Sequence, residues 1–366
     1  MKIPVANTSL NEDDARAAYE TVKSQWLSMG PRVKEFEENF CKCTGAKNAV
    51  AVNNGTSALH TALVALGIGH GDEVILPTLT FISTANVVLY QGAKPVLAEC
   101  DKETYNITAD EIRKRITAKT KAVISVDMNG MPADYDEITE LCEKKGIALV
   151  ADSAESLGAT YKKRRIGSIA PLHCFSFFPN KNITTGEGGM VTTGDAELAE
   201  KMRKIRNQGQ EGRYRHVMLG NNYRMTDLQA AVGNSQLARL DSVISEKQGL
   251  ADEYYRALEG VKGLELPHIP DYVTQHAWYL YTVNVDAKKR DIIVEGLAKE
   301  GIETRLSFPP IHAQPYYAER YGYGKADFPV SYSLWKSLID IPLWCGMGKE
   351  KQEIVVSHLK KILGRA

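Results

Sequence analysis

The sequence has no net charge, no long apolar run and few cysteines, and each deficit excludes a class of protein. Lys plus Arg and Asp plus Glu number 45 each among 366 residues, so no overall charge attracts nucleic acid or an anionic membrane. No apolar run approaches the roughly 18 residues of a membrane span. The first residues also lack the apolar core of a signal peptide. We therefore expect a cytoplasmic protein that binds neither nucleic acid nor membrane.

Disulfide and metal-binding patterns are missing as well. The six cysteines show no C-x-x-C spacing and are too sparse for a disulfide scaffold, which predicts free thiols. The eight histidines are scattered and form no H-E-x-x-H motif or Cys/His cluster. We expect no metal held by protein ligands.

The apolar residues that are present predict an α/β fold. Short apolar runs alternate with helical patterns from residue 48 to about residue 193. Runs such as 122–126 and 147–152 are apolar on both faces, as in strands of a mostly parallel sheet that helices cover. After Gly260 the pattern changes to one of prolines, separate strands and helices. We predict a large α/β domain over 1–248 and a smaller C-terminal α+β domain over 249–366.

The periodicity predicts the following elements. Strands are expected at 49–52, 73–76, 95–98, 122–126, 147–152, 173–178, 189–192, 277–285 and 303–308. Helices are expected at 57–66 behind an N-cap at Thr56, at 81–90, 135–145, 195–207, 227–240, 241–258 and 290–299, and from Ser331 and Glu350 onward.

One lysine stands on a polar turn between two expected strands. Lys181 follows the strand at 173–178, and Asn-Ile-Thr-Thr-Gly-Glu-Gly-Gly leads from it into the next strand. Its sequence neighbours offer hydrogen bonds and little bulk, which suits a lysine that forms a Schiff base. A surface hairpin whose glycines serve only positive φ would give the same local pattern.

Three further strand ends carry polar or aromatic groups, where ligands of open α/β sheets bind. Gly55, Thr56 and Ser57 lead directly into a helix, so backbone N–H groups and hydroxyls could hold a phosphate, although an ordinary N-cap looks the same. Phe81 follows the second strand, where it could stack on a planar ring or belong to the core.

Asp152 ends an apolar strand, and burying its carboxylate without a cation would be costly. No basic residue neighbours it in sequence, so its partner is either a distant side chain or a cofactor cation. A phosphate site, an aromatic plate, a buried carboxylate and a reactive lysine are together the contacts that pyridoxal 5′-phosphate (PLP) requires.

The chain carries four motifs in a specific order and spacing. They are Gly55-Thr-Ser-Ala-Leu, Asp152-Ser-Ala-Glu-Ser-Leu-Gly-Ala, Phe175-Ser-Phe followed by Lys181-Asn-Ile-Thr-Thr-Gly-Glu-Gly-Gly, and Asn221-Asn-Tyr-Arg-Met-Thr-Asp. These motifs resemble those of the DegT/DnrJ/EryC1/StrS sugar aminotransferases, over nearly the whole chain. The resemblance implies a fold-type I PLP-dependent transferase, similar to aspartate aminotransferase. It also implies a homodimer whose active sites use both subunits, and L-glutamate as the amino donor to a nucleotide-linked keto-sugar.

The resemblance assigns a role to each matching position. Lys181 resembles the lysine that binds the cofactor covalently and transfers the proton, and Asp152 resembles the partner of the pyridine nitrogen. The other expected cofactor contacts are ring stacking by Phe81, phosphate binding by Gly55, Thr56, Ser57 and Ser176, a phosphate contact from Asn222 of the neighbouring subunit, and Glu155 near the phenolic oxygen. A glutamate at position 155 is similar to perosamine-synthase-like members, where others have Gln or His.

Some positions depart from the family pattern or stay open. Asp127 lies where many members have a histidine-containing segment, which leaves its role undefined, and 162–165 is expected to be a solvated hairpin tip. His312 and Arg224 are candidates for substrate contacts, although each could equally be structural. Trp278 and Tyr279 are assigned to the core of the small domain.

The expected reaction is amination at C4, or at C3, of a keto-6-deoxyhexose linked to GDP or UDP, by a ping-pong mechanism, for polysaccharide, glycan or antibiotic sugars. Family relatives that deoxygenate the sugar have a histidine in place of the lysine, and Lys181 argues against that outcome. Two alternatives stay open. One is an aminocyclitol aminotransferase that acts on a keto-inositol, and the other is a non-catalytic PLP-binding regulatory protein. The contacts that select the sugar and the nucleotide are expected to come from variable loops.

Overall fold

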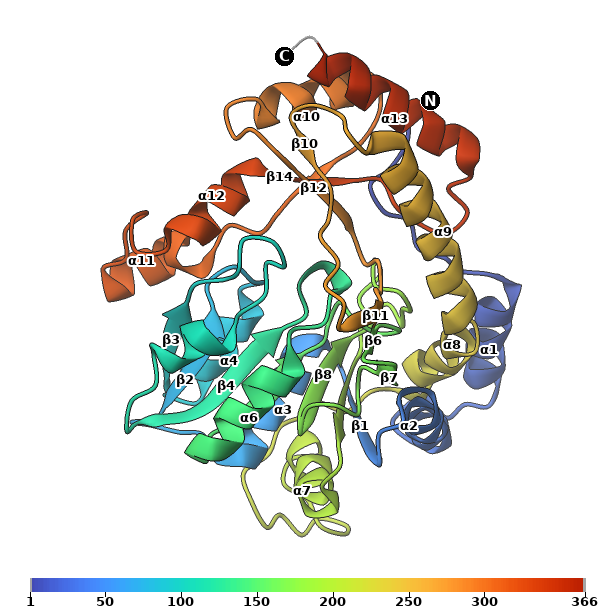
Figure 1. Cartoon of the computed structure of the whole chain (residues 1–366). Helices are drawn as coiled ribbons and strands as arrows, with labels where there is room; N and C mark the ends of the chain where they lie inside the picture. Colours follow the sequence, from blue (N-terminus) through green and yellow to red (C-terminus); the bar gives the residue numbers. More distant parts are fainter. Residues whose placement is uncertain (1, 365–366) are drawn as a thin grey trace.

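A seven-stranded sheet forms the centre of the computed structural model, which describes residues 2–364 (Figure 1). Its strands are β1 (Asn48–Val52), β2 (Glu73–Pro77), β3 (Lys94–Ala98), β4 (Thr120–Val126), β5 (Ala148–Asp152), β8 (Leu172–Ser176) and β9 (Gly189–Thr193). The strand order is β1-β9-β8-β5-β4-β2-β3. β9 is antiparallel to both of its neighbours, whereas the pairs among β8, β5, β4, β2 and β3 are parallel. The predicted mostly parallel sheet is confirmed.

Helices surround this sheet and bury both of its faces (Figure 1). They are α1 (Glu12–Lys23), α2 (Pro31–Thr44), α3 (Gly55–Leu66), α4 (Ser83–Tyr90), α5 (Ala109–Arg113), α6 (Tyr135–Lys145), α7 (Ala196–Arg206), α8 (Asp227–Leu237) and α9 (Leu240–Leu258). Side chains alternate between two core clusters along a strand. In β5, Leu149 and Ala151 belong to one cluster and Val150 to the other. This double burial explains why the strand sequence is apolar throughout.

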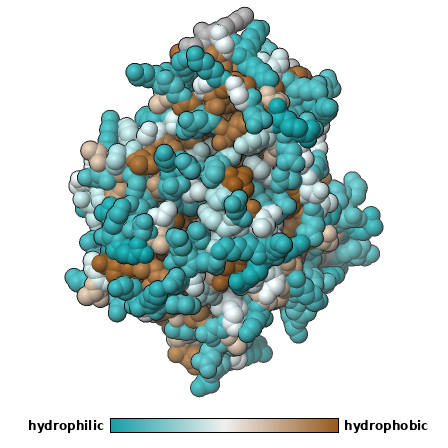
Figure 2. Space-filling model, in the orientation of Figure 1, coloured by the Kyte–Doolittle hydropathy of each residue, from teal (hydrophilic) through white to brown (hydrophobic). Residues whose placement is uncertain are grey.

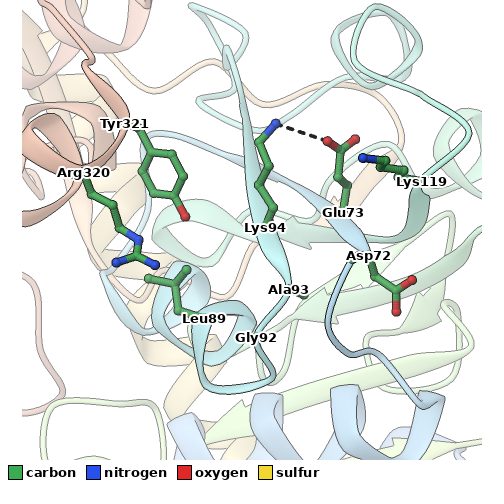
Figure 3. Close-up of a pocket in the computed structure, with 10 residues that line it drawn as sticks. Asp72, Glu73, Leu89, Gly92, Ala93, Lys94, Lys119, Arg320 and Tyr321 are labelled. Atoms are coloured by element: carbon green, nitrogen blue, oxygen red, sulfur yellow. Dashed lines mark hydrogen bonds and ion pairs between the residues drawn. The ribbon is translucent and has the colours of Figure 1, made fainter.

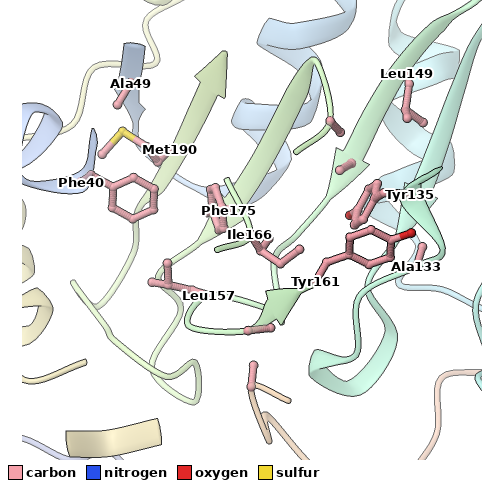
Figure 4. Packing of buried hydrophobic residues seen from close by; sticks show 14 of the residues in the cluster. Phe40, Ala49, Ala133, Tyr135, Leu149, Leu157, Tyr161, Ile166, Phe175 and Met190 are labelled. Atoms are coloured by element: carbon pink, nitrogen blue, oxygen red, sulfur yellow. The ribbon is translucent and has the colours of Figure 1, made fainter. Parts of the chain in front are cut away.

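Aromatic rings fill much of the first of these clusters (Figure 4). The rings of Phe40 and Phe175 meet edge to face at 5.0 Å between centroids, and Tyr135 meets Tyr161 in the same way at 5.8 Å. Burial of each such side chain contributes roughly 1.5–3 kcal/mol. The cluster thus fixes β5 and β8, whose ends carry Asp152 and Ser176.

A second, antiparallel sheet follows in the C-terminal part of the chain, in the order β10-β12-β14-β13. The elements are β10 (Leu264–Glu265), β12 (Tyr281–Val285), α10 (Arg290–Lys299), β13 (Arg305–Leu306), η2 (Ile311–Ala313), α11 (Pro315–Tyr321), α12 (Pro329–Ser337), β14 (Leu338–Ile341) and α13 (Lys349–Leu363). Ile3 packs in the core of this part and pairs with Ile302. The predicted division between 248 and 249 falls within α9 and stays a prediction.

A small third sheet, in the order β11-β6-β7, joins the two parts of the chain. Its strands are β6 (Thr160–Tyr161), β7 (Arg164–Arg165) and β11 (Val273–Gln275). Lys162 and Lys163 lie exposed at the tip between β6 and β7, with φ of 46° and 66°. The predicted solvated hairpin tip is confirmed.

Several predicted boundaries differ from the structure. α3 begins at Gly55 because Asn54, not Thr56, is its N-cap, and the Asn54 side chain accepts a hydrogen bond from the Ser57 amide at 2.8 Å. The strand expected at 277–285 covers only Tyr281–Val285, since the backbone of Ala277 instead donates to Gly130 at 3.0 Å. The strand at 303–308 covers only Arg305–Leu306, and helix 81–90 begins at Ser83.

The outer surface is largely hydrophilic on the side shown in Figure 2, where apolar side chains form separate small patches. Among residues 2–364, no helix is both long enough and apolar enough to cross a membrane.

Candidate active site

A cavity of about 490 Å³ lies at the carboxyl ends of β2, β4, β5 and β8, where an open α/β sheet binds its ligands. Seven of the predicted site residues line it: Gly55, Thr56, Phe81, Asp152, Glu155, Ser176 and Lys181. The strand order places their segments side by side, although Gly55 and Lys181 are 126 positions apart in the sequence.

Lys181 is held between a carboxylate and an aromatic ring. Its Nζ lies 3.3 Å from Glu155 Oε1 and 4.0 Å from the centre of the Tyr279 ring. Burial lowers the pKa of Lys181, but Tyr279 and Glu155 raise it more, so the net shift is upward. The assignment of Tyr279 to the small-domain core is therefore wrong, whereas Trp278 does pack in that core.

Asp152 is buried at the end of β5 and has only neutral partners. The Thr84 hydroxyl donates to Oδ2 at 2.9 Å and the Ala154 amide donates to Oδ1 at 3.3 Å. Within residues 2–364, no basic side chain forms an ion pair with it. Burial raises the pKa of Asp152 to about 6, so the carboxylate is mostly ionised at pH 7. The side chain faces a cavity in which a bound cation would be stabilised.

The N-terminus of α3 forms one wall of the cavity. A Cβ on Gly55 would lie 2.8 Å from the Ser176 Cβ, and one on Gly189 would lie 2.4 Å from the Asn54 carbonyl oxygen, so these segments meet closely. The Thr56 and Ser83 hydroxyls lie 2.8 Å apart. Helix N-terminal amides and hydroxyls together form a suitable site for a phosphate.

Four predicted residues lie outside the cavity lining. Ser57 is buried, and His312 is bonded to Thr78 at 2.8 Å and covered by Phe328. Arg224 donates to Asn207 at 2.9 Å, while Asn222 is exposed on the surface. Their functional roles stay predictions.

The sequence did not identify some residues that line the cavity, among them Ser83 and Phe308, and it left Arg305 open between a contact with the substrate pyrophosphate and an ion pair. Arg305 Nη1 donates to the Tyr279 hydroxyl at 3.2 Å, and its Nε donates to Asp340 at 3.1 Å. Ser83 lies within the same segment as Phe81, so a search for hydroxyls at this strand end would have found it. No local pattern marks Phe308.

A second pocket, of about 320 Å³, lies at the amino ends of β2 and β3 (Figure 3). Lys94 points to Glu73 there, with an ion pair of 3.2 Å, while Arg320 and Tyr321 lie across the pocket. It contains none of the predicted site residues. The cavity at the carboxyl ends is therefore the candidate active site.

The model of the DegT/DnrJ/EryC1/StrS aminotransferase family matches residues 8–360. The chain belongs to this family. It is 38% identical to the GDP-perosamine synthase of Caulobacter vibrioides, over 99% of this chain and 98% of the relative. The S. venezuelae protein DesV, solved with a ketimine intermediate, superposes with a TM-score of 0.93 at 35% identity, over 96% and 95% of the two chains. Spr1654 of Streptococcus pneumoniae in its PMP form gives a TM-score of 0.96 at 28% identity, over 100% and 98%.

This DegT/DnrJ/EryC1/StrS aminotransferase therefore has the predicted fold-type I architecture, and PLP is the cofactor of its family. The residues in the cavity fit that cofactor. The buried Asp152 lacks a cation that a protonated ring nitrogen would supply, and the α3 N-terminus offers amides and hydroxyls to a phosphate. Lys181 Nζ and the exposed Phe81 ring line the same space.

Asp127 lies beneath this aminotransferase site and organises the segment that carries Asp152 and Glu155. Its Oδ2 accepts hydrogen bonds from the Ser153 and Ser156 hydroxyls at 2.8 and 2.6 Å. Its Oδ1 accepts from the Tyr135 hydroxyl at 2.6 Å and from a backbone amide at 3.0 Å. Four donors for one fully buried carboxylate explain why a charged residue is tolerated there.

We expect Asp127→Asn to lower the free energy of unfolding by roughly 2–4 kcal/mol. An amide offers only one acceptor oxygen, so one pair of the four donors would face an NH₂ group instead. Thermal unfolding followed by circular dichroism measures the effect. Asp136→Asn is the matched control, because Asp136 pairs with Lys162 on the surface, and its Tm should stay unchanged. Equal Tm values for both variants would contradict the structural role of Asp127.

Proposed function

We propose that this aminotransferase moves an amino group from L-glutamate to C4 of a 4-keto-6-deoxyhexose linked to GDP or UDP. The observation that carries the proposal is the contact of Glu155 with Lys181 inside a cavity that also holds Asp152. A glutamate at position 155 resembles perosamine-synthase-like members, and a relative with 38% identity is named GDP-perosamine synthase.

Each residue contributes one defined action. PLP, when bound, supplies an electron sink for the bond that breaks at the α carbon of the donor. Lys181 Nζ would take the proton from that carbon as a base and deliver it, as an acid, to a second carbon, the C4′ of the cofactor. Asp152, ionised at neutral pH, holds a proton on the ring nitrogen. Glu155 and Tyr279 hold the Lys181 amine at the cavity wall between these steps.

Both substrates would use this one cavity in turn. Among the described residues that line this cavity of about 490 Å³, Lys181 is the one lysine, which supports a ping-pong order in which the oxo acid leaves before the keto-sugar enters. We further propose a homodimer with shared active sites, in which Asn222 of one subunit reaches the phosphate site of the other. Exposed apolar side chains near these segments support a contact surface, with Phe178 47% and Leu219 91% exposed.

The absorption spectrum of the PLP-loaded protein tests the proposal. Excess L-glutamate should bleach the visible cofactor band and release 2-oxoglutarate, and a GDP- or UDP-linked 4-keto-6-deoxyhexose should then restore the band. No bleaching would contradict L-glutamate as the donor. Restoration by a keto-inositol, but by no nucleotide-linked sugar, would instead indicate an aminocyclitol aminotransferase.

A further inference from the structure

A second lysine is buried behind Lys181. Lys247 lies on α9 and is only 6% exposed. Within residues 2–364, no carboxylate forms an ion pair with it, which is unusual for a buried lysine. Its Nζ donates a 2.7 Å hydrogen bond to the side-chain oxygen of Asn182, the residue directly after Lys181.

Asn182 connects this lysine to the walls of the active site. Its side-chain nitrogen donates to the carbonyl oxygens of Leu157 at 3.1 Å and Ala277 at 2.8 Å. Leu157 follows Glu155 by two residues, and Ala277 precedes Tyr279 by two. Asn182, held by Lys247, therefore connects the three segments that carry Lys181, Glu155 and Tyr279.

A cavity of about 20 Å³ separates the two lysines, and both of them line it. This volume is enough for about one water molecule. Asn180 and Lys181 line both this small cavity and the large one, and the buried Asn180 Oδ1 has no hydrogen-bond partner.

We propose that Lys247 is a positioning residue that holds Lys181 in place through Asn182 and, by its positive charge, favours the neutral amine of Lys181. A neutral amine is the form that attacks a carbonyl carbon and accepts a proton. The inference rests on the proposed function only in taking Lys181 as the reacting lysine.

The charged groups around the two lysines set the direction of the effect. Lys181 faces Glu155, Asp152 and Arg305 as well as the Tyr279 ring. Lys247 faces Lys181. It also faces Cys345, which lies in the segment before α13, and Glu246 lies beside Cys345. Burial lowers the pKa of Lys247 to about 8, and the nearby charge of Lys181 lowers it further within that shift. Below that pH, Lys247 is charged and repels a proton on Lys181, and above it the repulsion fades.

Reductive methylation of the cofactor-free protein tests this coupling. Lys181 is methylated with formaldehyde and cyanoborohydride across a pH series, and mass spectrometry gives the rate at that residue. Lys247→Gln removes the charge but keeps an N–H donor for Asn182, so below about pH 8 the rate at Lys181 should fall by roughly tenfold, and above that pH it should approach the wild-type rate.

Two control variants separate charge from packing. Lys247→Arg keeps a charge at every pH and should leave the rate at Lys181 below about pH 8 no lower than in the wild type. Lys201→Gln removes a charge from α7, where Lys201 bonds to Ala65 far from the site, and should not change that rate. A wild-type rate below about pH 8 in Lys247→Gln would overturn the proposal.

A second measurement covers the case in which Lys247→Gln fails to fold. In protein with ¹³Cε-labelled lysine, the NMR signal of Lys247 should titrate at a higher pH in Lys181→Ala than in the wild type, because coupling is reciprocal. An unchanged midpoint would overturn the proposal. Neither measurement uses PLP, L-glutamate or a sugar, so failure of the proposed reaction would not affect these results.

Discussion

Lys181→Ala is expected to lose amino transfer by about a thousandfold or more. The variant lacks the amine that carries the proton, and no other lysine lines the cavity of about 490 Å³ within the described chain. It should still bind PLP, because the α3 N-terminus and Asp152 are unchanged. Steady-state release of 2-oxoglutarate measures the rate, and gel filtration with absorbance detection measures the bound cofactor.

The matched control is Lys162→Ala, which removes a lysine at the solvated hairpin tip that forms an ion pair with Asp136. It should retain full activity. Normal turnover by Lys181→Ala would remove Lys181 from its proposed role. A variant that is folded but binds no PLP would instead show that the covalent bond, rather than the surrounding contacts, holds the cofactor.

Asp152→Asn is expected to lower the rate by about a hundredfold to a thousandfold while the protein still binds PLP through Lys181. A neutral amide cannot hold a proton on the ring nitrogen, so the electron sink weakens. The pH dependence of PLP affinity gives a second signature. In the wild type, the pKa of Asp152 near 6 means that the carboxylate is charged above this pH and loses its charge as the pH falls through it.

The favourable pairing with a ring cation is therefore present above about pH 6 and weakens below it, so wild-type PLP affinity should fall in acid. This change should be absent or much smaller in Asp152→Asn. Asp195→Asn serves as the control, because asparagine also caps a helix well and Asp195 caps the distant α7. An unchanged rate in Asp152→Asn would exclude Asp152 from the role.

The sequence was informative where one structural rule connects distant residues. Asp152 and Lys181 could be placed together because buried apolar runs predict parallel strands, whose carboxyl ends meet at one edge. Tyr279 could not be placed there, since an aromatic residue in an apolar segment is normally core. Long-range bonds bring it to the cavity, among them the bond from the Ala277 amide to Gly130 and the bond from Asn182 to the Ala277 carbonyl.

Local chemistry also left some choices undecided. Asn54 and Thr56 are both good N-caps, and which of them caps α3 depends on how the chain leaves β1. Lys247 lies on an amphipathic helix, where a lysine is expected to face water. Its burial arises because α9 packs against the turn that carries Asn182, a contact between segments 65 positions apart.

The pairing of Ile3 with Ile302 has a consequence for how the chain is made. The Ile3 amide donates to the Gly301 carbonyl at 2.8 Å, and the Glu303 amide donates to the Ile3 carbonyl at 2.9 Å. A ribosome delivers Ile3 well before these partners, which follow about 300 positions later in the chain. We therefore expect the residues around Ile3 to stay unpaired while the central sheet folds. The second sheet, which supplies Arg305 to the cavity, can be completed only after β14 has left the ribosome.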